Sequence, residues 1–170
     1  VFSLDSTSDT AYQSLQGTSM SAPAVSAALI LFQQHYNNLY SSYMKASTLK
    51  AVMTNTADEA GDSEGPDYQF GWGLINAKKA ADLITQKGVS SIIDERVLLQ
   101  GQTYTRTITA SASQPIKVTV AWTDRAAEIS TGTLDDSTPK LVNDLDVRVL
   151  KDGQTFYPWV LNPFFLQGGA

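Results

Sequence analysis

The chain has 170 residues, and its 17 Asp and Glu residues outnumber its 12 Lys and Arg, which gives a formal net charge of −5. This acidic balance disfavours nucleic acid and anionic membrane surfaces as partners, because both require clustered basic side chains. The absence of cysteine excludes disulfide bonds and thiol chemistry. No apolar run approaches the roughly 20 residues needed to span a bilayer. We therefore expect a globular chain of one domain or two small ones.

The most informative segment begins at residue 17, where Gly-Thr-Ser-Met-Ser-Ala-Pro is followed by an apolar run over 24–32. An apolar run with no polar face predicts a helix that is buried. Ser19 would lie at the start of that helix, where unpaired N–H groups and the helix dipole favour a developing negative charge. Pro23 is expected in the first turn, where its missing N–H costs nothing. The segment is either a buried helix that happens to follow Gly-Thr-Ser or the carrier of a nucleophilic serine, and we favour the second interpretation.

Two further helices are predicted in the first half of the chain. Residues 46–56 place apolar side chains on one face, and residues 77–86 repeat them with the 3.6-residue period. Asn76 is a suitable N-cap for the second of these helices, and Gly88 is a suitable stop. The loop 58–67 holds five acidic residues. It either binds a cation or is a solvated loop, and we favour the loop because no metal-binding spacing is present.

The second half of the chain has the two-residue period of strands. Four strands are predicted, over 103–110, 116–122, 145–149 and 155–159. Asp152-Gly153 separates the last two and is a strong hairpin signal. The change in period near residue 88 predicts a boundary between a mainly helical part, 1–88, and a small antiparallel β-sandwich, 89–170.

The segment 17–23 resembles the nucleophile motif of the subtilisin-like serine peptidases. Residues 67–77, with a Gly-Trp-Gly turn before a helix, resemble the closing motif of the same family. The resemblance covers residues 1–87 and implies the C-terminal part of a doubly wound α/β catalytic domain. It also implies that Ser19 is the nucleophile, that the substrate is an extended polypeptide cleaved through an acyl-enzyme, and that the parent protein is secreted.

The other catalytic residues of this family are expected outside the chain. Their place in the family is upstream of the nucleophile, and only 18 residues precede Ser19. His35, the one histidine, lies 16 residues further along the same predicted helix, about 24 Å away at 1.5 Å per residue. A general base must reach within about 3 Å of the proton it removes, so His35 is expected only to end the helix, before Asn37-Asn38. We therefore expect the isolated chain to be inactive and its partner to be the missing N-terminal part of the catalytic domain.

Residues 120–124 and 141–146 resemble a β-sandwich module that follows the catalytic domain in some alkaline members of the family. The resemblance implies calcium sites in such a module. Asp144 and Asp146 are two residues apart, so on an extended strand both carboxylates would face the same side. They are either calcium ligands, which would need further oxygen donors, or charges that keep a strand edge soluble. The sandwich is expected to be incomplete in this chain.

Three functions remain open at this point: a secreted serine endopeptidase, which we favour, a β-sandwich module for binding or adhesion, and a catalytically dead pseudo-peptidase. A parallel sheet is normally covered by helices on both faces. Because most of that sheet is missing, the predicted helix over 24–32 lacks its natural cover. We expect the isolated chain to self-associate, to exchange elements with a second copy, or to fold mainly through its sandwich.

Overall fold

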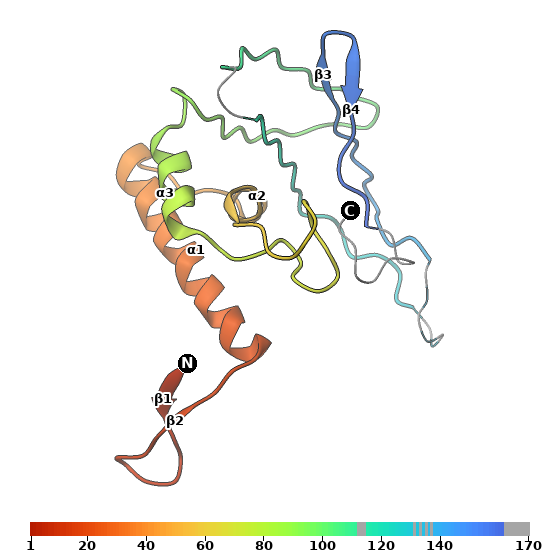
Figure 1. Ribbon diagram of the computed structural model, residues 1–170. Coiled ribbons are helices and arrows are strands. Elements are labelled where there is room, and N and C mark those ends of the chain that lie inside the picture. The colour runs from red at the N-terminus through yellow and green to blue at the C-terminus, as the bar shows by residue number, and fades with distance from the viewer. Residues whose placement is uncertain (112–114, 131, 133, 135, 137, 162–170) are drawn as a thin grey trace.

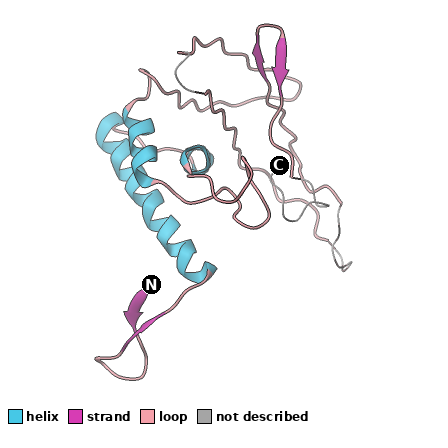
Figure 2. Cartoon of the chain, viewed as in Figure 1, coloured by secondary structure: helices cyan, strands magenta, loops and turns pink. Residues whose placement is uncertain are grey.

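The computed structural model describes residues 1–111, 115–130, 132, 134, 136 and 138–161. This part of the chain contains three helices and two separate two-stranded antiparallel sheets (Figures 1 and 2). The elements in chain order are β1 (Phe2–Leu4), β2 (Tyr12–Ser14), α1 (Thr18–Tyr40), α2 (Ala46–Thr56), α3 (Ala77–Thr85), β3 (Val149–Lys151) and β4 (Gln154–Phe156). This arrangement is consistent with part of an α/β domain.

The hairpin of β1 and β2 leads directly into α1. Phe2 pairs with Ser14 and Leu4 with Tyr12, and the rings of Phe2 and Tyr12 stack with their centroids 5.3 Å apart. Every residue of both strands is exposed. In Figure 1 the hairpin lies beyond the N-terminal end of α1, away from α2 and α3.

The core lies where α2 and α3 pack against the C-terminal half of α1 (Figure 1). Its buried apolar side chains are Phe32, Tyr36, Met44, Val52, Ala80 and Ile84. Tyr40 adds a hydrogen bond across the same contact, from its hydroxyl to the backbone oxygen of Ile84 at 2.8 Å. The small, fully buried Ala80 lets α3 approach its neighbours closely.

Helix α1 differs from its prediction at its C-terminal end and in its burial. It continues through Asn37-Asn38 to Tyr40 and stops at Ser41, which has a left-handed φ of 52°. The last turn is held by the hydrogen bond from Tyr40 to Ile84, and the Gln33 side chain makes two hydrogen bonds, of 2.7 and 2.9 Å, with the backbone of Met44 just after the helix. The predicted burial of 24–32 is confirmed for Phe32, which is 3% exposed, and is wrong for the other residues, which are exposed or half-buried. Ile30 and Leu31 are 69% and 59% exposed, because α2 and α3 cover only the face of α1 that carries Phe32 and Tyr36.

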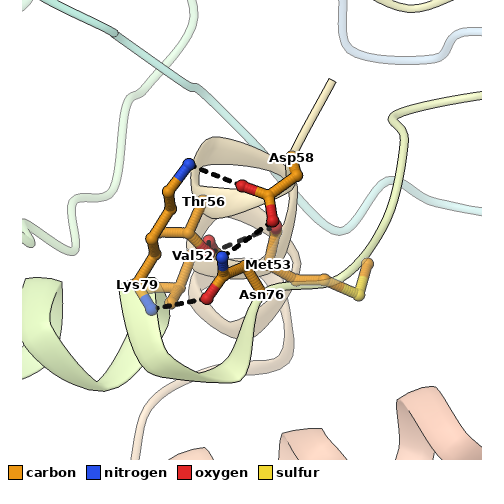
Figure 3. A network of polar contacts seen from close by, with 6 residues as sticks. All are labelled: Val52, Met53, Thr56, Asp58, Asn76 and Lys79. Atoms are coloured by element: carbon orange, nitrogen blue, oxygen red, sulfur yellow. Dashed lines mark hydrogen bonds and ion pairs between the residues drawn. The ribbon is translucent and has the colours of Figure 1, made fainter. Parts of the chain in front are cut away.

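The predicted helices over 46–56 and 77–86 are confirmed as α2 and α3, and so is the cap of α3. The Asn76 side chain accepts a hydrogen bond from the Lys79 N–H at 2.8 Å. Figure 3 shows that Asn76 and Lys79 also reach Asp58, which follows α2. Asn76 donates to one carboxylate oxygen at 2.8 Å, and the Lys79 ammonium lies 2.5 Å from the other. This network joins the end of α2 to the start of α3.

The described residues do not confirm the predicted sandwich. Neither 103–110 nor 116–122 forms a strand, and the strand predicted over 145–149 begins only at Val149. The hairpin around Asp152-Gly153 is confirmed, with positive φ at both residues, 51° and 78°, as a tight two-residue turn requires. Alternating residues become a strand only when a neighbouring strand accepts their hydrogen bonds. In 116–122 the described partner is instead the Asn55 side chain of α2, which contacts Lys117 and Thr119.

Candidate active site

Gly17 turns the chain from the hairpin into α1. Its backbone has φ 141° and ψ 174°, a region that is nearly restricted to glycine. The Gly17 carbonyl accepts hydrogen bonds from the N–H groups of Met20, at 3.0 Å, and Ser21, at 3.2 Å. The helix therefore begins directly after this residue, and Ser19 is the second residue of α1.

Ser19 is exposed at the positive end of this long helix. The first turn contains no acidic side chain that would neutralise the partial charge. Among the described residues the Ser19 hydroxyl has no hydrogen-bond partner, whereas the hydroxyls of Ser21 and Ser26 both donate to carbonyls one turn back, at 3.4 and 3.1 Å. Ser19 thus presents a hydroxyl beside unpaired helical N–H groups at the start of α1, as the sequence predicted.

Pro23 lies deeper in the helix than predicted. Because α1 begins at Thr18, Pro23 is its sixth residue and not part of the first turn. A proline there cannot donate to the carbonyl four residues earlier, which belongs to Ser19. The Ser19 carbonyl thus lacks its usual helical donor, a consequence that the sequence pattern alone did not suggest.

His35 is far from Ser19, as predicted, but it does not end the helix. Its Nε2 atom forms a hydrogen bond of 2.9 Å with the Thr85 hydroxyl of α3. Helical geometry places it about 24 Å from Ser19. His35 therefore connects α1 to α3 and cannot take a proton from Ser19.

The Gly-Trp-Gly turn packs next to α1 and α2. The hydrogen bonds between Asp58 and Leu74, at 2.8 and 2.9 Å, close the loop 58–74. A Cβ atom at Gly73 would lie 2.1 Å from the Asp58 carbonyl oxygen, so only glycine fits this crossing. The turn forms one wall of an apolar pocket of about 150 Å³ with Val25 of α1 and Met53 of α2.

The acidic residues of this loop bind backbone and a neighbouring lysine. Asp67 accepts the N–H groups of Gln69 and Phe70, at 2.7 and 2.5 Å, and Glu59 accepts that of Gly65 at 2.8 Å. The hydrogen bond from Lys79, followed by that from Asn76, lowers the pKa of Asp58 below 3.8. These three carboxylates thus order the loop through hydrogen bonds at the surface.

The segments 120–124 and 141–146, which resemble a sandwich module, contact each other through Asp124, a residue that the sequence did not single out. The Asp124 carboxylate accepts hydrogen bonds from the Val142 N–H at 2.8 Å and from the Asn143 side chain at 2.6 Å. Partial burial raises the pKa of Asp124, but the hydrogen bonds from Val142 and Asn143 outweigh it, so that the pKa is lowered. Asp124 is the last residue of the segment 120–124, and its place in that segment was the available sequence signal for this contact.

Asp144 and Asp146 are not part of a cluster of potential metal ligands in the described part of the chain. No three His, Cys, Asp or Glu side chains lie together there in a way that could hold an ion. Asp146 is strongly exposed and lies 3.9 Å from Arg148, and both aspartates precede β3. Calcium prefers six to eight oxygen ligands, so these two carboxylates alone do not fit it.

Residues 3–73 match the model of the Subtilase family. The matched segment is subtilase-like, and it contains Ser19 and the Gly-Trp-Gly turn. The chain is 39% identical over 71 residues to Serotype-specific antigen 1 of Mannheimia haemolytica, an alignment that covers 42% of this chain and 7% of the relative. It is 33% identical over 82 residues to an Extracellular serine protease of Serratia marcescens. That alignment covers 46% of this chain and 7% of the relative.

A third relative is the Neisserial autotransporter lipoprotein NalP of Neisseria meningitidis serogroup B. It is 38% identical over 66 residues, which covers 39% of this chain and 6% of the relative. The chain thus spans less than a tenth of the length of these relatives. No solved structure matches it. None of the helices in the described residues has the length and apolar character needed to cross a membrane.

Proposed function

We propose that this chain is part of a serine endopeptidase of the subtilase type and that Ser19 is its nucleophile. One observation carries the proposal: the segment that matches the Subtilase family model includes Ser19, whose free, exposed hydroxyl lies at the start of α1. The relative named as an extracellular serine protease supports the reaction class, and its name supports secretion of the parent protein.

In the proposed reaction the Ser19 oxygen attacks the carbonyl carbon of a peptide bond. The carbonyl oxygen becomes an oxyanion, and the unpaired N–H groups at the start of α1 stabilise it. The intermediate then collapses to an acyl-enzyme and releases the amine, and water hydrolyses the ester in the same way. The substrate is an extended polypeptide.

A base must take the proton from Ser19 and return it to the leaving nitrogen. The sequence has one histidine, His35, which lies in the C-terminal half of α1 and forms a hydrogen bond with Thr85 of α3. We therefore propose that the base, its orienting acid and a second oxyanion donor come from other parts of the longer protein. A serine hydroxyl without a base is a weak nucleophile, so the chain by itself is expected to be inactive.

A fluorophosphonate probe tests the assignment of Ser19. In the longer protein that contains this sequence, Ser19→Ala is expected to abolish both labelling and peptide cleavage. Ser26→Ala is the matched control, because Ser26 is also an exposed serine of α1 but donates to the Ala22 carbonyl. Loss of labelling in Ser26→Ala, or its retention in Ser19→Ala, would contradict the proposal.

The isolated chain provides the second test. We expect its labelling rate to equal that of its own Ser19→Ala variant, because no base reaches the hydroxyl. Efficient labelling of Ser19 in the isolated chain would show that a base lies within this sequence, contrary to the proposal.

A further inference from the structure

We propose that residues 87–95 form a strap that fastens the chain after α3 across the helical core, with Glu95 as its far anchor at the N-terminus of α2. The proposal is independent of the peptidase assignment. It places the end of the helical unit after Glu95, whereas the change of sequence period suggests an end at Gly88.

The near anchor of the strap is Lys87. Its ammonium nitrogen lies 4.7 Å from the ring centroid of Tyr36 and 4.4 Å from that of Tyr40, both on α1. It also contacts the Tyr36 hydroxyl at 2.5 Å. A cation close to two neighbouring aromatic rings is attracted to both, and the attraction increases as water is excluded. Lys87 therefore ties the start of the strap to α1.

The middle of the strap is held by backbone and packing. The Gln86 carbonyl accepts hydrogen bonds from the N–H groups of residues 89, 90 and 91, which makes a compact turn. The Ser91 hydroxyl donates to the Leu83 carbonyl of α3 at 2.6 Å. Ile93 packs against the core cluster. The segment thus follows the surface of the helices after Gly88.

Glu95 anchors the far end at α2. One carboxylate oxygen accepts hydrogen bonds from the Lys45 N–H at 2.8 Å and from the Thr48 hydroxyl at 2.5 Å. Lys45 is the N-cap residue of α2, and its own side chain caps nothing. The carboxylate of a residue 50 positions further along the chain therefore caps the positive N-terminal end of this helix. This cap has no local sequence signal, because Lys45 is a poor capping residue.

The strap has a defined consequence for the molecule. Release of Glu95 is expected to free the first turn of α2 and the segment 87–95, while the contacts of α1 with α3 remain. The strap would thus determine how firmly the residues after 96 are held to the helical core.

Limited trypsin digestion of the full chain tests this inference, because its cleavage sites at Lys87 and Arg96 bracket the strap. In the unmodified chain we expect slower cleavage after Lys87 than after Arg96. Glu95→Ala removes two hydrogen bonds and is expected to increase cleavage after Lys87 at least about fivefold. Glu95→Gln keeps an acceptor but loses the charge, so an intermediate rate is expected. The matched control is Glu128→Ala, at an exposed acidic residue, which should leave the rate unchanged.

Hydrogen exchange separates release of the strap from general unfolding. In Glu95→Ala the Lys45 amide is expected to exchange faster, while the amides of α3 around Ile84 keep their rates. Equal cleavage after Lys87 and Arg96 in the unmodified chain would overturn the inference. So would an unchanged Lys45 amide in Glu95→Ala, or equal acceleration at Lys45 and Ile84, which would mean that Glu95 supports the whole fold and not a separate strap.

Discussion

Gly17→Ala tests how the backbone presents Ser19. Gly17 has a φ of 141°, and a Cβ added there would have no heavy atom within 4 Å. The substitution therefore introduces no clash with neighbouring groups, and its cost comes from the backbone conformation alone. Residues forced into such sparsely populated regions cost about 1–3 kcal/mol. The start of α1 is expected to bear this cost, because the Gly17 carbonyl accepts its first hydrogen bonds.

Amide hydrogen exchange at Met20 and Ser21 measures this effect, since both N–H groups donate to Gly17. Destabilisation of the closed helix start by about 1–3 kcal/mol corresponds to roughly 5- to 150-fold faster exchange. Gly101→Ala is the control, because Gly101 also has a positive φ, of 75°, and open space around it, but lies far along the chain. Unchanged exchange at Met20 and Ser21 in Gly17→Ala would refute the reasoning, as would equal acceleration in Gly101→Ala.

Three further predictions concern the core, the loop and the exposed face of α1. Ile84→Ala should lower the free energy of unfolding by about 2–5 kcal/mol, because Ile84 is fully buried, whereas Ile30→Ala should change it by less than about 0.5 kcal/mol; urea denaturation of both variants checks this. The pKa of Asp58 is lowered by its hydrogen bond from Lys79, so its contribution to stability is complete above pH 3.8 and is lost as the pH falls through the lower folded value. Exchange of the Leu74 amide, corrected for intrinsic rates, should therefore accelerate at acidic pH in the unmodified chain but not in Asp58→Asn, and identical profiles would contradict the assignment. Finally, because α1 leaves the large apolar side chains of Ile30, Leu31 and Leu39 exposed, we expect the isolated chain to self-associate, and light scattering that shows a monomer at all concentrations would argue against it.

Local sequence patterns predicted the helices well. The 3.6-residue period located α2 and α3, and Asn76 was correctly identified as a cap, because these features depend on residues within one or two turns. The Asp152-Gly153 turn was also found from its two residues. The predictions of strands over 103–110 and 116–122 were wrong because a strand depends on partners that are distant in sequence. A two-residue period shows that a segment is suited to a strand, but the hydrogen bonds must come from elsewhere in the chain.

The sequence alone determined that Ser19 would lie at the start of a helix, because Gly17, the small residues and the apolar run act within a few residues of it. It also determined that His35 could not reach Ser19, since helical rise fixes their separation. Only the tertiary structure decided which face of α1 is buried, that Glu95 accepts hydrogen bonds at the N-terminus of α2, and that Asp124 contacts Asn143. Each of these contacts joins residues far apart in sequence, and their partners are chosen by how the helices and loops pack, which no local pattern specifies.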